Sequence, residues 1–140
     1  MSTEANKATA RRMRETLDQS KGTEGVEEYY APNSVFHFPG SPPLDREQLS
    51  AMSAMFYAAF PDLNHTFEDQ IAEGDKVMSR VTFRGKHQGE FQGIPATGKE
   101  VAFGAILIDR YEDGKVVEHW TQMDTMGLMQ QLGVIPTPEA

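Results

Sequence analysis

The last third of the chain alternates apolar and polar residues with the period of a β-strand. The run FGAILIDRYE, residues 103–112, is followed by Asp113-Gly114 and then by KVVEHWTQMD, residues 115–124. Asp-Gly between two alternating runs is a strong signal for a type I′ hairpin. The segment GLMQQLG comes next and has the pattern of a short helix. This region therefore predicts two long paired strands that lead into a helix.

The second of these strands has two distinct faces, because successive residues of a strand point to opposite sides. One face carries Trp120, Gln122 and Asp124. The other face carries His119, Thr121 and Met123. The first face places the only tryptophan and a carboxylate together near a strand end. An apolar pocket commonly acquires an acid/base group in this way, so we interpret this face as the candidate site.

Helical spacing dominates the beginning of the chain. Residues 4–19 have a helical pattern, and residues 24–30 predict a second, shorter helix. The apolar contacts expected from the first helix are Ala8, Met13 and Leu17. The same segment contains Arg11, Arg12 and Arg14, which we expect on the solvated face of the helix.

A third helix is predicted to begin after Asp45, where Gln48 completes a capping-box pattern, and to stop at Pro61. The remaining strands are predicted over residues 34–38, 64–73 and 76–88. Helices on one side of a curved antiparallel sheet make an α+β fold, and the length of 140 residues favours a single domain over residues 1–140.

Composition excludes several classes of function. The formal net charge of -8 argues against nucleic acid as a partner, because binding phosphates requires a basic patch. The absence of cysteine excludes disulfides and thiolate chemistry. No apolar run approaches the ~20 residues that span a bilayer, and the N-terminus lacks the apolar core of a signal peptide. We therefore expect a cytoplasmic protein with no membrane partner.

Two familiar sites can be tested against the sequence. The segment Gly93–Lys99 nearly matches a phosphate loop, but Glu100 stands where Ser or Thr should hold magnesium, and the segment lies between strands. The four histidines show no H-E-x-x-H spacing. We expect neither a metal nor a cofactor.

Asp124 is the first candidate for a general acid/base. Desolvation beside Trp120 would raise the pKa of its carboxyl group toward the range that suits proton transfer. The alternative is that Asp124 caps the helix that begins near Met126. Two interpretations are open for Trp120 as well: it lines the wall of the pocket, or it belongs to the hydrophobic core.

Three further polar residues interrupt apolar surroundings. His37 shares a strand face with Val35, which makes it a structural or a catalytic histidine. Arg80 lies in a mostly apolar strand, so it pairs with a buried carboxylate or meets a substrate oxygen. His87 lies where a strand becomes a loop, with glycines on both sides. We expect Arg80 and His87 on or just behind the pocket.

Several linked motifs resemble one known family. They are Tyr30-Ala31-Pro32 with His37, Phe60-Pro61-Asp62, Arg80-Val81-Thr82, Gly85-Lys86-His87-Gln88-Gly89, Gly93-Ile94-Pro95-Ala96-Thr97-Gly98-Lys99, Glu118-His119-Trp120, Asp124, and Gln131-Leu132-Gly133. This set is similar to the hallmark of SnoaL-like proteins, the polyketide-cyclase or ester-cyclase group of the nuclear-transport-factor-2-like superfamily. The resemblance covers nearly the whole chain.

The resemblance implies a cone-shaped α+β barrel in which a curved antiparallel sheet and three N-terminal helices enclose an apolar cavity. It also implies a cofactor-independent aldol ring closure with an aspartate as acid/base, and Asp124 matches that aspartate. The other residues on matching positions, expected to line or support the cavity, are His37, Arg80, His87 and Trp120. We expect further binding or core contacts from Gln122, Met52, Met55, Phe56 and Phe60.

Two functions of different class remain open. One is an enzyme for acid/base chemistry on a small, largely apolar, carbonyl-bearing molecule, by ring closure, isomerisation or a lyase step. The other is a non-catalytic binding or assembly module on the same fold. Both faces of the long terminal strands carry apolar residues, so we also expect a homodimer built on the face that does not cover the cavity.

Overall fold

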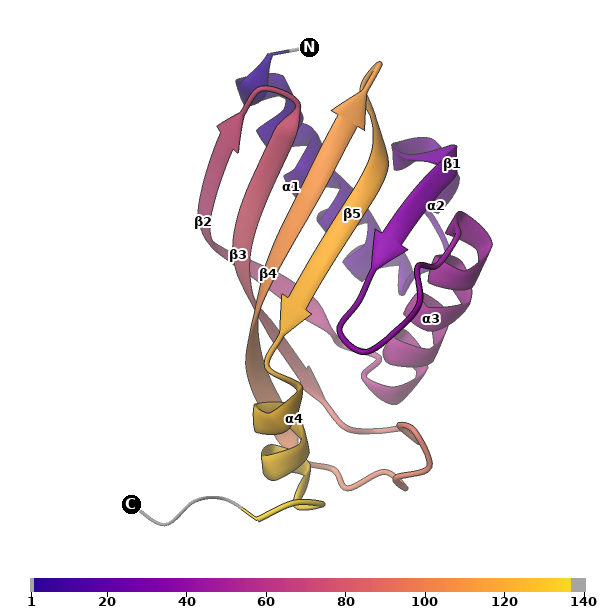
Figure 1. Cartoon of the computed structure of the whole chain (residues 1–140). Helices are drawn as coiled ribbons and strands as arrows, with labels where there is room; N and C mark the ends of the chain where they lie inside the picture. The colour runs from indigo at the N-terminus through magenta and orange to yellow at the C-terminus, as the bar shows by residue number, and fades with distance from the viewer. Residues whose placement is uncertain (1, 137–140) are drawn as a thin grey trace.

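Five strands form one curved sheet, with helices packed against its concave side (Figure 1). The computed structural model describes residues 2–136. The strands are β1 (Tyr30–His37), β2 (Asn64–Glu73), β3 (Lys76–Lys86), β4 (Glu100–Glu112) and β5 (Lys115–Met123). Their order across the sheet is β1-β5-β4-β3-β2. The predicted α+β class is confirmed, although the sheet is open, with β1 and β2 as edges.

The sequence led us to expect a wholly antiparallel sheet, and this expectation is wrong for one pair of strands. Three neighbouring pairs are antiparallel, but β1 runs parallel to β5, with Val35 opposite Glu118 and His37 opposite Trp120. A tight turn forces antiparallel pairing only between strands that it joins directly. Because β1 and β5 are far apart in the sequence, no turn constrains their relative direction.

The predicted terminal hairpin is confirmed. Asp113 and Gly114 both have positive φ, 50° and 79°, as a type I′ turn requires. Just beyond this turn the register shifts, so that Val117 is an extra residue between the pairs Tyr111↔Val116 and Arg110↔Glu118. A bulge of this kind increases the local twist, and it helps to curl the sheet around its concave side.

The helices follow their capping signals. They are α1 (Thr3–Ser20), α2 (Val26–Tyr29), α3 (Arg46–Ala59) and α4 (Thr125–Leu132). The Asp45 side chain accepts from the backbone N–H of Gln48, and the Gln48 side chain accepts from that of Asp45, so the capping box is confirmed. None of the helices within residues 2–136 is long and apolar enough to cross a membrane.

The buried face of α1 differs from the predicted one. Ala10, Met13 and Leu17 are buried, whereas Ala8 is exposed. Arg14 is also buried, with 2 % of its surface exposed, and so it does not lie on the solvated face. The reason is geometric, because residue 14 falls between positions 10 and 17 on the stripe that faces the sheet.

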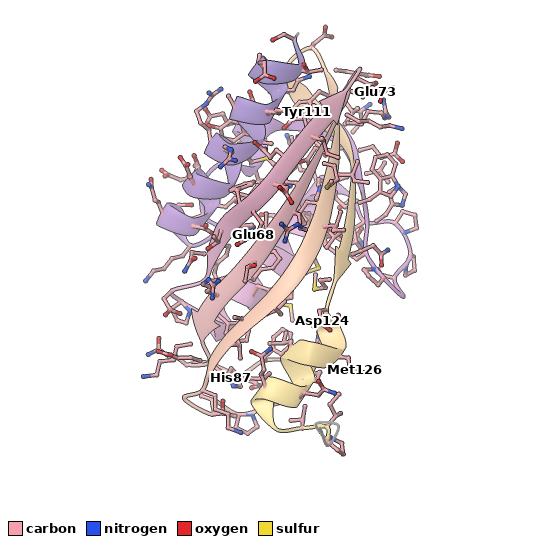
Figure 2. All side chains as sticks on the ribbon, turned by 90° about the vertical axis from the view of Figure 1, so that its left-hand side faces the viewer. Glu68, Glu73, His87, Tyr111, Asp124 and Met126 are labelled. Atoms are coloured by element: carbon pink, nitrogen blue, oxygen red, sulfur yellow. The ribbon has the colours of Figure 1, made fainter. Side chains whose placement is uncertain are left out.

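Beyond β5 the chain forms α4, which lies at the lower end of the sheet (Figure 2). Asp124 is the N-cap of this helix, and its Oδ1 accepts from the backbone N–H of Gly127 at 2.8 Å. Leu128 and Leu132 are the buried residues of this helix. The helix therefore covers the end of the hydrophobic core, away from the hairpin turn.

Candidate active site

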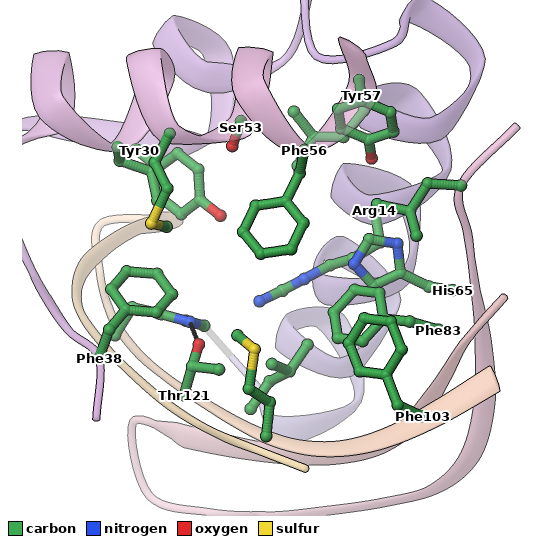
Figure 3. A pocket seen from close by; sticks show the side chains of 17 residues that line it. Arg14, Tyr30, Phe38, Ser53, Phe56, Tyr57, His65, Phe83, Phe103 and Thr121 are labelled. Atoms are coloured by element: carbon green, nitrogen blue, oxygen red, sulfur yellow. Dashed lines mark hydrogen bonds between the residues drawn. The ribbon is translucent and has the colours of Figure 1, made fainter. Parts of the chain in front are cut away.

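A cavity lies between the concave face of the sheet and the helices α1 and α3 (Figure 3). Its lining of 17 residues is mostly apolar and rich in aromatic rings, among them Phe38, Phe56, Phe83 and Phe103. The cavity volume is about 100 Å³. An apolar cavity with a few convergent polar groups is the usual form of a small-molecule site.

Arg14 and Asp109 form a fully buried, two-pronged ion pair at the cavity wall. Nη1 of Arg14 lies 2.6 Å from Oδ2 of Asp109, and Nη2 lies 3.1 Å from Oδ1. Burial alone raises the pKa of Asp109, but Arg14 and His119 outweigh it and hold that pKa well below its ordinary value. Asp109 is therefore a carboxylate, and it can only accept hydrogen bonds.

His119 connects this carboxylate to a hydroxyl group of the cavity. Its Nδ1 lies 2.7 Å from Oδ1 of Asp109, and its Nε2 lies 2.5 Å from Oγ1 of Thr121. Nδ1 must carry a proton, because the carboxylate cannot donate one. Burial lowers the pKa of His119 more than Asp109 raises it, so the ring is neutral and Nε2 accepts from the Thr121 hydroxyl. The carboxylate thereby fixes the tautomer of the imidazole, as in catalytic triads.

A second histidine–aspartate pair lies on the other side of the cavity, where His65 belongs to the lining and Asp18 lies behind it. The Asp18 carboxylate accepts from Nδ1 of His65 at 2.9 Å, from the backbone N–H of His65 at 2.8 Å and from the Tyr57 hydroxyl at 2.6 Å. These groups come from α1, β2 and α3, so Asp18 ties three elements together. Burial also lowers the pKa of His65 below its ordinary value.

The cavity lies on the opposite face of β5 from the one we predicted. His119, Thr121 and Met123 line it, whereas Trp120 is half-buried on the outer face and Gln122 is exposed. The alternation along the strand is as expected, but the helices cover the other face. Asp124 is exposed and also lies outside the cavity lining. It accepts a hydrogen bond from Gly127, so its geometry matches the alternative role of a helix cap.

Two other predicted residues lie on the outer face as well. Nε2 of His37 is 2.8 Å from Oε2 of Glu118, and the His37 ring stacks on Trp120. The Arg80 side chain, 52 % exposed, donates to Oδ2 of Asp69 at 2.6 and 2.9 Å. The expectation that Arg80 lies at the pocket is wrong, because the inward positions of β3 are the odd-numbered ones.

His87 is fully buried but is not part of the cavity lining. Its Nδ1 accepts from the backbone N–H of Thr97 at 3.2 Å, and its ring packs against Phe60, which is core. His87 therefore anchors the loop after β3 (Figure 2). Among the residues expected from the third helix, Met52 and Phe56 line the cavity, while Met55 is 60 % exposed.

The polar residues that the fold brings together were not predicted as site residues from the sequence; they are Arg14, Asp18, His65, Asp109 and His119. Two signals could be read in the sequence, because Asp109 interrupts an apolar run of its strand and Arg14 interrupts the apolar stripe of its helix. Within residues 2–136, no three histidine or acidic side chains are grouped so that they could hold a metal ion.

Comparison with known proteins places this geometry in a family. The model of the SnoaL-like polyketide cyclase domain matches residues 7–132. The chain belongs to the SnoaL-like polyketide cyclase family. Aklanonic acid methyl ester cyclase DnrD from Streptomyces peucetius is 32 % identical over an alignment of 135 residues that covers 92 % of this chain and 92 % of its own.

Solved structures support the same assignment. AclR from Streptomyces galilaeus, a candidate hydroxylase, superposes with a TM-score of 0.90 at 29 % identity and covers 99 % of this chain and 87 % of its own. IdmH from Streptomyces antibioticus, a candidate polyketide cyclase, has a TM-score of 0.81 at 33 % identity and covers 92 % of this chain and 99 % of its own. These relatives share the fold but bear names for different activities.

We predict that Asp109→Asn destabilises the protein by about 3–5 kcal/mol, because it leaves Arg14 buried without a countercharge. Urea denaturation followed by circular dichroism measures the change. Asp69→Asn is the matched control: it breaks the exposed pair with Arg80 and should cost less than about 1 kcal/mol. Equal effects of the two substitutions would contradict the assigned role of the buried pair.

The two buried histidines predict how stability depends on pH. Their pKa values are lowered in the folded chain, so below about pH 6.5 the unfolded chain binds protons that the folded chain does not. The free energy of unfolding should therefore fall as the pH decreases from 7.5 to 5.5, by up to about 1.4 kcal/mol per pH unit for each histidine. Urea titrations at both pH values measure this, and His119→Asn should show a smaller decrease. A wild-type stability that does not change over this range would refute the prediction.

Proposed function

We propose that this protein catalyses acid/base chemistry next to a carbonyl group, with ring closure of a small, largely apolar molecule as the reaction. The observation that carries the proposal is the Asp109–His119–Thr121 chain of hydrogen bonds, anchored by Arg14 and opening into an aromatic-lined cavity. The similarity to aklanonic acid methyl ester cyclases supports ring closure in particular.

His119 is the proton carrier in this proposal. Nε2 releases the hydroxyl of Thr121 and removes a proton from the carbon beside the carbonyl. Asp109 stabilises the imidazolium that forms. The resulting enolate carbon attacks a second carbonyl carbon of the same molecule, and the displaced π-electron pair becomes an alkoxide. The alkoxide oxygen is on the carbon that has just bonded to the carbon that lost its proton, two bonds away from it, so the same imidazolium can return the proton.

The apolar lining assists this chemistry. Because the lining is mostly apolar, the Asp109 carboxylate acts on the imidazolium of His119 more strongly than it would in water. All groups in this scheme belong to the chain itself. The alternative of a non-catalytic binding module uses the same cavity but requires no proton transfer, and this difference makes the two functions separable by experiment.

We predict that His119→Asn lowers the rate of ring closure by about 10²–10⁴-fold, as expected for loss of one general acid/base. The substitution retains an N–H group that can bond to Asp109 while it removes Nε2. The assay follows cyclisation of aklanonic acid methyl ester, the compound in the relatives' name, by chromatography. Wild-type turnover in the variant would overturn the role of His119, and tight binding by wild type without turnover would favour the binding module.

Asp124→Asn is the matched control, since the sequence motif assigns the acid/base role to Asp124. Asparagine caps helices about as well as aspartate, so the variant should keep α4 intact. We expect its turnover to match wild type, because Asp124 lies outside the cavity lining. Loss of turnover in this variant alone would restore the sequence-based assignment.

We also propose a homodimer that pairs through the outer face of the sheet. This face has exposed or half-buried apolar residues, of which Ile106 and Ile108 lie on the central strand β4; the others are Ile71, Met78 and Trp120. Ion pairs flank them, such as Arg80–Asp69 and Arg110–Glu118. A face with an apolar centre and charges of both signs at its rim suits self-association.

We predict that sedimentation at micromolar concentration gives a dimer, with twice the chain mass of 15.6 kDa. Ile106→Arg should convert the dimer to a monomer, because it places like charges at the centre of the paired faces. A wild-type monomer would contradict this arrangement.

A further inference from the structure

We propose that His65, held by Asp18, is a second general base of the cavity, positioned to exchange protons with a ligand carbon from the side opposite His119. This inference rests on the proposed function, because it assumes that the ligand carries an enolisable carbon. It adds a second proton-transfer residue that acts on the same carbon.

The first step of the argument is the state of the His65 ring. Nδ1 donates to the Asp18 carboxylate at 2.9 Å, so the proton of the neutral ring is on Nδ1 and the lone pair is on Nε2. Within residues 2–136, this is the only side-chain hydrogen bond of His65, which leaves Nε2 without a partner. In His119, by contrast, Nε2 already accepts from Thr121. His65 therefore offers the more accessible lone pair.

The second step is the position of the ring. His65 lies on β2 and His119 on β5, and β3 and β4 separate these strands in the sheet. Both rings line the same cavity, and Figure 3 shows His65 on the opposite side from Thr121, with Phe56 between them. A flat ligand held between the aromatic rings would thus present one face to each histidine.

The third step is the rigidity of the pair. Asp18 accepts three hydrogen bonds, from Tyr57 and from the side chain and backbone of His65, so its position is determined by α3 and β2 together. The His65 ring also packs against Phe83, with ring centroids 4.6 Å apart. Besides Asp18, the charged groups that act on the ring from other elements are Arg14 and Asp109, which neutralise each other. The ring is thus preorganised beside one uncompensated carboxylate, that of Asp18.

The chemistry balances as a simple exchange. Nε2 of His65 takes a proton from the carbon, and the electron pair of the C–H bond passes into the enolate. The imidazolium exchanges that proton with solvent and returns one to the same face of the carbon, which restores the ketone. His119 does the same at the other face, so two bases on opposite sides replace both hydrogens of a methylene group, whereas one base replaces only one.

The test measures hydrogen exchange into 2-tetralone, a bicyclic aromatic ketone with enolisable methylene hydrogens, in deuterated buffer by proton NMR. After correction for exchange in buffer alone, wild type should replace both hydrogens of a methylene group. His65→Asn should stop at the singly deuterated product, since asparagine can keep the N–H bond to Asp18 but has no Nε2. His119→Asn should also stop at one deuteron, and the double variant should fall to the buffer rate.

Transfer of the product between variants gives a second measurement. The singly deuterated ketone isolated from His65→Asn should lose its remaining hydrogen to His119→Asn but not to fresh His65→Asn. His37→Asn is the matched control, because it makes the same substitution at a histidine on the outer face of the sheet, outside the cavity lining, so it should still give two deuterons. If His65→Asn does not fold, His65→Gln provides the same comparison.

The outcomes separate this inference from the proposed function. Two deuterons in His65→Asn, with exchange reduced only in His119→Asn, would overturn the role of His65 and leave the function standing. No exchange above buffer in wild type would count against the base chemistry of the cavity altogether. A loss in His37→Asn equal to that in His65→Asn would show that the effect of the substitution is not specific to the cavity and would overturn the proposal.

Discussion

The buried ion pair between Arg14 and Asp109 is the constraint on which the rest of this structure depends. Taking either charge out of water alone would cost several kcal/mol, so each residue requires the other. The pair fixes α1 against β4 and decides which face of the sheet is covered. Because the pair lies at the wall of an apolar cavity, it also introduces a fixed charge distribution there, and the state of the neighbouring histidine follows from it.

That histidine shows how burial and charge compete. Near Asp109 alone, His119 would tend to become an imidazolium, but burial favours the neutral ring and Arg14 adds to that preference. The result is a neutral imidazole whose tautomer is fixed by a carboxylate. His65 reaches the same state beside Asp18, with different supporting residues. The cavity therefore has two neutral bases, a combination that suits carbon acids better than strongly polar ligands.

The relatives show why this lining, rather than the fold, is the basis for a functional argument. A candidate polyketide cyclase and a candidate hydroxylase share this architecture, with TM-scores of 0.81 and 0.90. The scaffold supplies a curved sheet, two covering helices and an apolar interior. The reaction depends on which inward positions carry polar groups, and in this chain those positions are on α1, β2, β4 and β5.

The sequence by itself determined the elements and their periodicity. The capping box at Asp45, the Asp113-Gly114 turn and the alternation along residues 103–124 depend on neighbouring residues only, so they could be predicted from local rules. The linked motifs were enough to indicate the family. Only the tertiary structure decided which face of each strand became the interior. Both faces of β4 and β5 carry apolar residues. The alternation therefore places His119 and Trp120 on opposite faces of the sheet, but it does not indicate which face the helices cover. The choice depends on the pairing of Arg14 with Asp109, residues 95 positions apart in the chain, and no local pattern records a contact at that separation.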